Sequence, residues 1–257
     1  MSEVVIKFSK SVLNDTTTIK NIFEITKDAR YIMVDTKNEL FFLSRLEKVL
    51  KDYNLLYFIA EFPNELFLFG EILNIVIDVK IKINEGYLNY IPIQIMVISN
   101  QYKQIILHVI KKLSETYGFS LIHYSLENNV LRIQFHSDSR PIEFICKNGC
   151  IETELENLSF TLNKIAFNCH RLIIHRSAIE AIHSRITELA GHNAYNPVDV
   201  YKICLRDYQI KNIKNSLNDL IAHPQVQYYL KNRYKQFSIL SNGTLSSFQQ
   251  FIESAFS

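Results

Sequence analysis

Apolar and polar residues alternate in the middle of the chain with the period of two that is typical of β-strands. The alternation continues on both sides of the asparagine pair at residues 128–129. A turn there pairs Leu126 with Leu131 and Tyr124 with Ile133, which places these apolar side chains on one face. The pattern therefore predicts an antiparallel hairpin with one buried face.

Residues 142–155 show the same alternation around Asn148-Gly149, a pair that favours a type I′ hairpin turn. In that register Cys146 faces the apolar side of the hairpin and Cys150 faces away from it. Two thiolates on opposite faces cannot bind one zinc ion, so we predict no metal site here. Four cysteines in 257 residues do not suggest a disulfide framework, and we expect a cytoplasmic, reducing environment.

A helix followed by four strands is predicted twice. Residues 101–117 have a helical period and precede the strands described above. Earlier, a helix at 41–53 precedes four expected strands, at 55–61, 66–69, 75–83 and 87–98. These patterns predict antiparallel β-meander modules of the order α-β-β-β-β, covering about 38–98 and 101–156. An internal duplication is one explanation, and chance similarity of two α+β stretches is the other.

A heptad of apolar residues begins directly after the second module. Leu158, Ile165, Leu172, Ile179 and Ile186 recur every seven residues. This spacing predicts one long helix over residues 157–189, which would act as a strut or as a coiled-coil seam.

Further helical signals follow the heptad. Asn196-Pro197 has the residues preferred at the N-cap and first position of a helix. A last apolar stripe runs through the C-terminal helix that is predicted from Leu245 onward. We therefore expect an α+β protein with a sheet-rich region at 1–156 and an all-helical region at 157–257.

The composition is that of a folded globular protein, with 47% hydrophobic and 21% charged residues. The net charge of +2 gives no strong signal for a polyanionic partner, but residues 158–257 hold 11 Lys and Arg against 6 Asp and Glu. The most apolar run, at 55–79, is interrupted by charges, and the N-terminus lacks the apolar segment of a signal peptide. We expect no membrane segment. The many Ile, Asn and Lys residues suggest a microbial or viral source.

One short motif could carry catalysis. Asp78 and Lys80 share a face of the strand predicted at 75–83, and metal-dependent nucleases of the PD-(D/E)xK type use such a pair with Mg²⁺. Their additional acid would be Glu65 or Glu71. The plainer interpretation is a solvated strand face. Gly-rich phosphate loops and the GxSxG and HExxH motifs are absent from the sequence.

A basic and aromatic face is predicted near residue 230. Aromatic rings can stack on bases while cations contact phosphates, so this face could bind nucleic acid, although an ordinary solvated helix face has the same pattern. The residues concerned, with two cations of the preceding helix, are Tyr228, Tyr229, Lys231, Arg233, Lys235, Lys202 and Arg206.

These patterns favour a non-catalytic subunit or adaptor of a larger assembly, without a cofactor. It would bind a protein partner, or a second copy of itself, through the long helix or the C-terminal helix, and nucleic acid through the basic face. The alternative function is the Mg²⁺-dependent nuclease.

Overall fold

The computed structural model describes most of the chain. Its described residues are 3–6, 24, 29–50, 55–81, 88, 91–117, 122–127, 130–135, 140–189, 196–211, 213, 217–232, 241–243 and 245–255.

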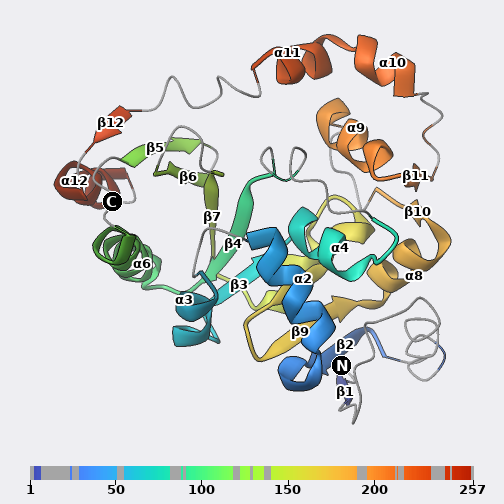
Figure 1. Ribbon diagram of the computed structural model, residues 1–257, viewed down its shortest axis with the longest axis horizontal. Helices are drawn as coiled ribbons and strands as arrows, with labels where there is room; N and C mark the ends of the chain where they lie inside the picture. The colour runs from blue at the N-terminus through green and yellow to red at the C-terminus, as the bar shows by residue number, and fades with distance from the viewer. Residues whose placement is uncertain are drawn as a thin grey trace.

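A ten-stranded mixed sheet forms the centre of this described part (Figure 1). Its strands lie in the order β1-β2-β9-β8-β3-β4-β7-β6-β5-β12, and neighbours are antiparallel except for the pairs β1–β2 and β4–β7. The strands are β1 (Glu3–Ile6), β2 (Tyr31–Asp35), β3 (Leu66–Phe69), β4 (Ile93–Ile98), β5 (Ile122–Glu127), β6 (Val130–Gln134), β7 (Ile142–Lys147), β8 (Ile165–Phe167), β9 (Arg171–His175) and β12 (Ser241–Gly243). A separate parallel pair consists of β10 (Ile186–Thr187) and β11 (Gln209–Ile210).

Helices cover both faces of the sheet and extend beyond it. In Figure 1, α2 and α4 lie over the middle of the sheet, α6 packs beside α12 near the β5–β12 end, and α9, α10 and α11 form a separate group at the upper right. The helices are α2 (Leu40–Leu50), α3 (Leu55–Glu61), α4 (Glu71–Ile77), α6 (Tyr102–Tyr117), α7 (Ile151–Glu156), α8 (Arg176–Ser184), α9 (Pro197–Leu205), α10 (Leu217–Ala222), α11 (Pro224–Asn232) and α12 (Leu245–Ala255), with 3-10 turns at Thr36–Asn38 and Thr161–Asn163.

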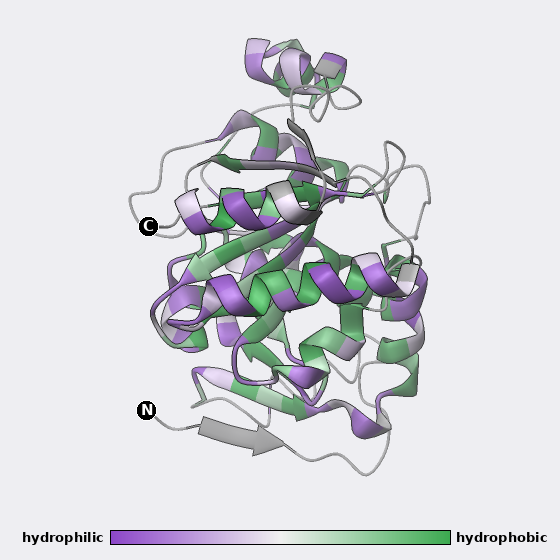
Figure 2. Cartoon of the chain, turned by 90° about the vertical axis from the view of Figure 1, so that its left-hand side faces the viewer, coloured by the Kyte–Doolittle hydropathy of each residue, from purple (hydrophilic) through white to green (hydrophobic). Residues whose placement is uncertain are grey.

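Two hydrophobic cores lie on opposite faces of the sheet. Ile32 and Val34 of β2 belong to the larger core, whereas the alternate residues Tyr31 and Met33 belong to a smaller core that α7 covers. Figure 2 shows green, apolar residues alternating with purple ones along the helices, as expected when one helical face packs inward. The central strands are buried on both faces, so their sequences are continuous apolar runs without alternation. This explains several of the differences from the sequence prediction that are described below.

The α+β class is confirmed, and so is the first hairpin. Strands β5 and β6 pair Tyr124 with Ile133 and Leu126 with Leu131, in the predicted register. The helix predicted at 101–117 is present as α6. Within the described residues, no helix is long and apolar enough to span a membrane.

The predicted α-β-β-β-β module at 38–98 is wrong. Residues 55–61, expected as a strand, form α3, and the strand expected at 75–83 begins inside α4, which ends at Ile77. Every residue of α4 from Ile72 to Ile77 is buried, so the segment lacks the polar face by which a helix is recognised. Arg45 of α2 stabilises the end of α4, because its guanidinium donates to the carbonyls of Ile75 and Val76 at 2.6 and 2.8 Å.

The hairpin predicted at Asn148-Gly149 is also wrong. These residues lead from β7 into α7, and Cys150 is the N-cap residue of that helix. Helix α7 then covers the smaller core with Ile151 and Leu155. The second predicted module therefore has three strands, and the two modules do not share one order of elements.

The long helix predicted at 157–189 is not formed. This stretch contains β8, β9, α8 and β10, so the region is not all-helical. Leu172, Ile173 and Ile174 are all buried because they face the two cores alternately, and a heptad count cannot distinguish such a strand from a helix. Association through the long helix is therefore excluded as a mechanism. The domain division at residues 156 and 157 stays a prediction.

The later helices are formed in part as expected. The Asn196 side chain accepts a hydrogen bond from the backbone N–H of Val198 and caps α9. The C-terminal helix is present as α12, but its apolar stripe packs inside the chain. Phe248 and Ile252 are fully buried, and the Phe248 ring meets Tyr124 at 5.3 Å between centroids. These two residues are covered and do not offer the expected surface for association.

Candidate functional site

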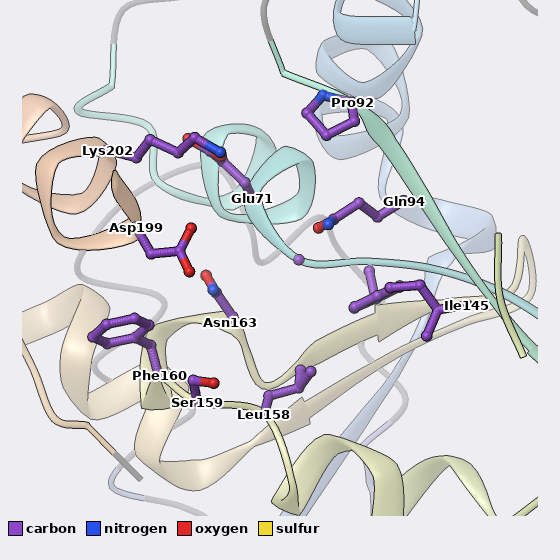
Figure 3. A pocket seen from close by; sticks show the side chains of 12 residues that line it. Glu71, Pro92, Gln94, Ile145, Leu158, Ser159, Phe160, Asn163, Asp199 and Lys202 are labelled. Atoms are coloured by element: carbon purple, nitrogen blue, oxygen red, sulfur yellow. The ribbon is translucent and has the colours of Figure 1, made fainter. Parts of the chain in front are cut away.

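A cavity of about 230 Å³ lies where β3 ends and β4 begins, on the face of the sheet that carries the smaller core (Figure 3). Strands, loops and helices that are far apart in the sequence contribute to it. Its lining residues are Phe69, Gly70, Glu71, Pro92, Gln94, Ile145, Leu158, Ser159, Phe160, Asn163, Asp199 and Lys202.

Gly70 forms the sharp turn from β3 into α4. Its backbone has φ +77° and ψ −143°, a conformation that is essentially restricted to glycine. A Cβ atom at this position would lie 2.5 Å from Oε1 of Gln94. Glycine is therefore required both for the turn and for the close approach of β4, and the turn carries Glu71 to the edge of the cavity.

A row of polar side chains crosses the sheet beside this turn. Gln94 of β4 lies opposite Glu143 of β7, which lies opposite Arg132 of β6. Nε2 of Gln94 donates to one carboxylate oxygen of Glu143 at 3.0 Å, and Nε of Arg132 donates to the other at 2.7 Å. Both oxygens of Glu143 are thus engaged, and the Gln94 amide is held in one orientation.

Helix α9 forms the opposite wall with Asp199 and Lys202, which are one helical turn apart. Burial raises the pKa of the Asp199 carboxyl above its ordinary value, although Lys202 opposes this shift. Burial would lower the pKa of the Lys202 ammonium, but the nearby carboxylates of Glu71 and Asp199 contribute to a net rise. The helix therefore presents a protonatable acid and a firmly charged cation side by side.

The remaining wall comes from the segment between α7 and β8. In Figure 3 the Asn163 amide points toward the Asp199 carboxylate, with the Phe160 ring and Leu158 below them. Nδ2 of Asn74 donates to Oδ1 of Asn163 at 2.7 Å, which orients that amide. The cavity therefore combines amides and charged groups with an aromatic ring.

The charges around the cavity are largely compensated. Oε1 of Glu71 lies 3.6 Å from Nε of Arg206, whose side chain is 3% exposed. The Glu71 carboxylate also contributes to the raised pKa of Lys202. The two acids Glu71 and Asp199 are thus balanced by the two cations Lys202 and Arg206, and a bound anion would not meet a net negative site.

Asp78 and Lys80 do not form the predicted pair on a strand face. Asp78 follows α4 and is 2% exposed, and its carboxylate pairs with Arg185 and accepts a hydrogen bond from Tyr208 at 2.6 Å. Lys80 is exposed, and Glu71 belongs to the cavity instead. The expected solvated strand face is therefore a buried ionic contact, and Asp78 and Lys80 do not adopt the arrangement that the nuclease requires.

The predicted basic face is divided between different environments. Lys202 lines the cavity and lies 5.3 Å from the centroid of the Tyr229 ring, and Arg206 is buried. Tyr228 is 66% exposed on α11, with exposed Lys231 one turn later. Arg233 and Lys235 lie outside the described residues.

Four cavity residues, Gln94, Phe160, Asn163 and Asp199, were not indicated by any sequence motif. Each lies in a segment whose pattern predicts only a strand or a helix, and only the fold brings the four together. Gly70 was an available signal, because an isolated glycine after an apolar run indicates a tight turn or a close backbone approach.

Metal ligands are not clustered in the described part of the chain: it contains no group of three or more His, Cys, Asp or Glu side chains placed to hold a metal ion. Burial raises the pKa of the Cys146 thiol to about 12, which disfavours the thiolate that a zinc site needs. Cys150 is exposed and lies 3.1 Å from the Thr153 hydroxyl.

No protein-family model and no curated protein sequence matches the chain. Similar solved structures are CCA-adding enzymes. The Thermotoga maritima enzyme complexed with tRNA is 15% identical to this chain. The match covers 86% of this chain and 54% of the enzyme, with a TM-score of 0.49. A CCA-adding enzyme complexed with ATP is 15% identical, and the match covers 86% of this chain and 53% of the enzyme, with a TM-score of 0.49. A complex with CTP is 14% identical, and the match covers 86% of this chain and 55% of the enzyme, with a TM-score of 0.46. The chain spans about half the length of the enzymes that it matches.

These matches contradict the predicted non-catalytic adaptor and the expectation that the chain is not an enzyme, because the similar structures are enzymes. Neither the adaptor nor its nuclease alternative is retained. At this level of identity and TM-score, the similarity does not by itself assign an activity. The function of this chain is therefore inferred from its own cavity.

Proposed function

We propose that the cavity binds a nucleotide and that the chain is a nucleotide-dependent enzyme of nucleic-acid processing, comparable in kind to a nucleotidyltransferase. The observation that carries this proposal is the composition of the lining. Aromatic and amide side chains there accompany an acid and a cation on one helix. A nucleotide requires a flat apolar contact, a hydrogen-bonding edge and an anion contact together, and a pocket that is mostly apolar with a few placed polar groups can supply them.

A nucleobase matches the uncharged part of the lining. The edge of a base offers hydrogen-bond donors and acceptors, and the amides of Gln94 and Asn163 carry both kinds of group. The Phe160 ring can pack against the base, as aromatic side chains do in single-stranded nucleic-acid sites. Asp199 adds a group that accepts when ionised and donates when protonated.

A phosphate group matches Lys202. The ammonium group is a compact point charge suited to phosphate, and its raised pKa keeps it protonated at neutral pH. Arg206 compensates Glu71 from behind at 3.6 Å, so Lys202 does not have to neutralise this carboxylate alone. The site can therefore accept a negatively charged ligand without a large electrostatic penalty.

Helix α11 is the surface that we propose for a nucleic-acid strand. It packs against α9, and its Tyr229 lies on the Lys202 side chain. Tyr228 and Lys231 are exposed beside it and offer a ring for stacking and a cation for a phosphate. Lys231→Ala should lower the salt slope of RNA binding by about 0.7, the value for one phosphate contact on a single strand. An unchanged slope would remove nucleic acid from this surface.

Equilibrium binding of nucleotides to the full chain tests the cavity. ATP and CTP come first, because they are the ligands in two of the similar structures, followed by GTP and UTP, each with and without Mg²⁺. We expect saturable binding, with Kd raised roughly 10- to 100-fold in Lys202→Met, the loss that corresponds to one hydrogen bond to a charged group.

Lys211→Met is the matched control, since Lys211 forms an exposed ion pair with Glu188 and does not line the cavity. It removes the same charge and should leave Kd unchanged. Absence of binding for all four nucleotides, or equal weakening by both variants, would contradict the proposal.

A further inference from the structure

Helices α4 and α9, which both line the cavity, are connected at the start of α4 by the ion pair of Glu71 with Arg206. A second connection lies at the other end of α4. Asp78 directly follows α4, and its carboxylate is almost completely buried. The hydroxyl of Tyr208 donates to Oδ2 of Asp78 at 2.6 Å, and the Arg185 guanidinium pairs with the same oxygen. Since Tyr208 lies three residues beyond the end of α9, this contact connects the ends of the two helices.

Most of the contacts in this second connection involve Arg185. Its Nη2 donates to the backbone carbonyl of Arg206, the C-cap residue of α9, at 3.1 Å. The guanidinium carbon also lies 4.2 Å from the centroid of the Tyr208 ring, within cation–π range. In addition, the Arg185 carbonyl accepts from the backbone N–H of Gln209 at 2.9 Å. Together with an ion pair to the exposed Asp207 at 3.8 Å, Arg185 thus makes four contacts with the chain at and after the end of α9.

The backbone of Arg185 is itself adapted to this position. Arg185 follows α8 in the left-handed conformation, with φ 61° and ψ 21°, which residues other than glycine adopt uncommonly. Glycine would satisfy this C-cap at no conformational cost. The contacts of the guanidinium account for the presence of an arginine here instead.

We propose that Arg185 is a positioning residue for the cavity: by fixing the end of α9 against the end of α4, it holds Asp199 and Lys202 opposite Gln94 and Asn163. This inference rests on the proposed nucleotide site for its effect on binding, but not for its effect on α9. An arginine is suited to the role because its planar fork can bond to the Asp78 carboxylate and the Arg206 carbonyl at once, whereas a lysine provides a single charged centre.

Hydrogen exchange and nucleotide binding of Arg185→Met test the inference on the full chain. The amides of α9 should exchange about tenfold faster than in the wild type, while those of β3 and β4 should not change. Kd for the bound nucleotide should rise about tenfold, and Arg185→Lys should restore only part of the loss. Arg176→Met is the control, because Arg176 lies on the same helix and pairs with Glu180 at the surface.

Tyr208→Phe provides a milder variant in case Arg185→Met does not fold. It keeps the ring beneath the guanidinium and removes only the hydrogen bond to Asp78, so a smaller change in the same direction is expected at α9. Unchanged exchange in α9, or faster exchange spread evenly over the sheet, would overturn the positioning role. If the wild type bound no nucleotide, the proposed function would fail, and the exchange of α9 would still decide the role of Arg185.

Discussion

The acids around the cavity lie in different electrostatic environments. Glu143 is engaged through both oxygens by Arg132 and Gln94, and Glu71 lies against Arg206. Asp199 instead has a raised pKa, so it takes up a proton more readily than an exposed aspartate does. At the residue scale, Asp199 is therefore an acid of the cavity whose charge responds to pH and to a ligand.

Asp199→Asn should change how stability depends on pH. The folded state has the higher pKa at this carboxyl, so its contribution to stability is full below the unfolded pKa, near 3.8, and is lost as pH rises through the raised folded value. The stability of Asp199→Asn relative to the wild type should therefore increase with pH across that window. Urea unfolding of both proteins at a series of pH values, from about 3.5 to about 7, measures this difference. If the difference in the free energy of unfolding between the two proteins did not change with pH, the raised pKa of Asp199 would be contradicted.

Asp78→Ala should be costly although Asp78 was expected on a solvated strand. Removing the carboxylate leaves the Arg185 guanidinium and the Tyr208 hydroxyl without their shared acceptor. Breaking a buried ion pair in this way lowers the free energy of unfolding by about 3 kcal/mol or more. Lys80→Ala is the control, and as an exposed side chain it should change stability by less than about 0.5 kcal/mol. Equal urea midpoints for the two variants would refute the buried contact.

At the element scale, the turn from β3 to α4 shapes one corner of the cavity. Gly70→Ala forces an L side chain into a backbone region that only glycine occupies well, and drives its Cβ against Gln94. The free energy of unfolding should fall by about 1–3 kcal/mol. Gly149→Ala is a useful comparison, because its Cβ would meet only the flexible end of the Glu154 side chain and its φ is not in the left-handed range. A Gly70→Ala variant as stable as Gly149→Ala would mean that the turn is described incorrectly.

The N-cap of α9 makes a separate prediction for that helix. Asn196→Ala removes the bond to the backbone N–H of Val198 and should lower the free energy of unfolding by about 1 kcal/mol. Because Asn196 is exposed and does not line the cavity, nucleotide affinity should change less than in Lys202→Met. Thermal or urea unfolding, combined with one titration, checks both statements. A larger loss of affinity than in Lys202→Met would show that this end of α9 matters more than the cation.

Elements with local signals were predictable from the sequence. The β5–β6 register follows from alternation around a two-residue turn, and the α9 start follows from Asn196 and Pro197. The last residues of α4, 75–77, were expected in a strand and β9 as part of a helix, because short stretches buried on all sides give no periodicity that distinguishes a helix from a strand. Segments that are buried on all sides have few polar residues, and the prediction of helices and strands depends on the spacing of such residues. Whether a segment is buried on all sides depends on the tertiary structure.

The site was less predictable than the fold for a similar reason. Gln94, Asn163 and Asp199 are separated by more than 30 residues from one another, and none belongs to a motif. They converge only after β3 and β4 pair and Arg206, at the end of α9, meets Glu71 at the start of α4. Two of the residues predicted from the sequence do line the cavity. Glu71 was predicted for the nuclease, and Lys202 was predicted for the basic face.

At the scale of the whole molecule, the cavity lies where the sheet meets the helices of the C-terminal part. Strand β4 supplies Gln94, the first residue of α4 is Glu71, and α9 supplies Asp199 and Lys202. Helix α11 packs against α9 and carries the exposed Tyr228. A nucleotide in the cavity and a nucleic-acid strand on α11 would therefore occupy adjacent parts of one surface.

Photochemical crosslinking of an azido-ATP to the full chain, followed by mass spectrometry of the peptides, tests the nucleotide cavity most directly. We expect labelled peptides from the lining, in particular those that contain Phe160, Asn163 or Lys202, with labelling suppressed by excess ATP and strongly reduced in Lys202→Met. Lys211→Met should be labelled like the wild type. Labelling that resists excess ATP, or that falls on peptides remote from this cavity, would contradict a nucleotide site between α4 and α9.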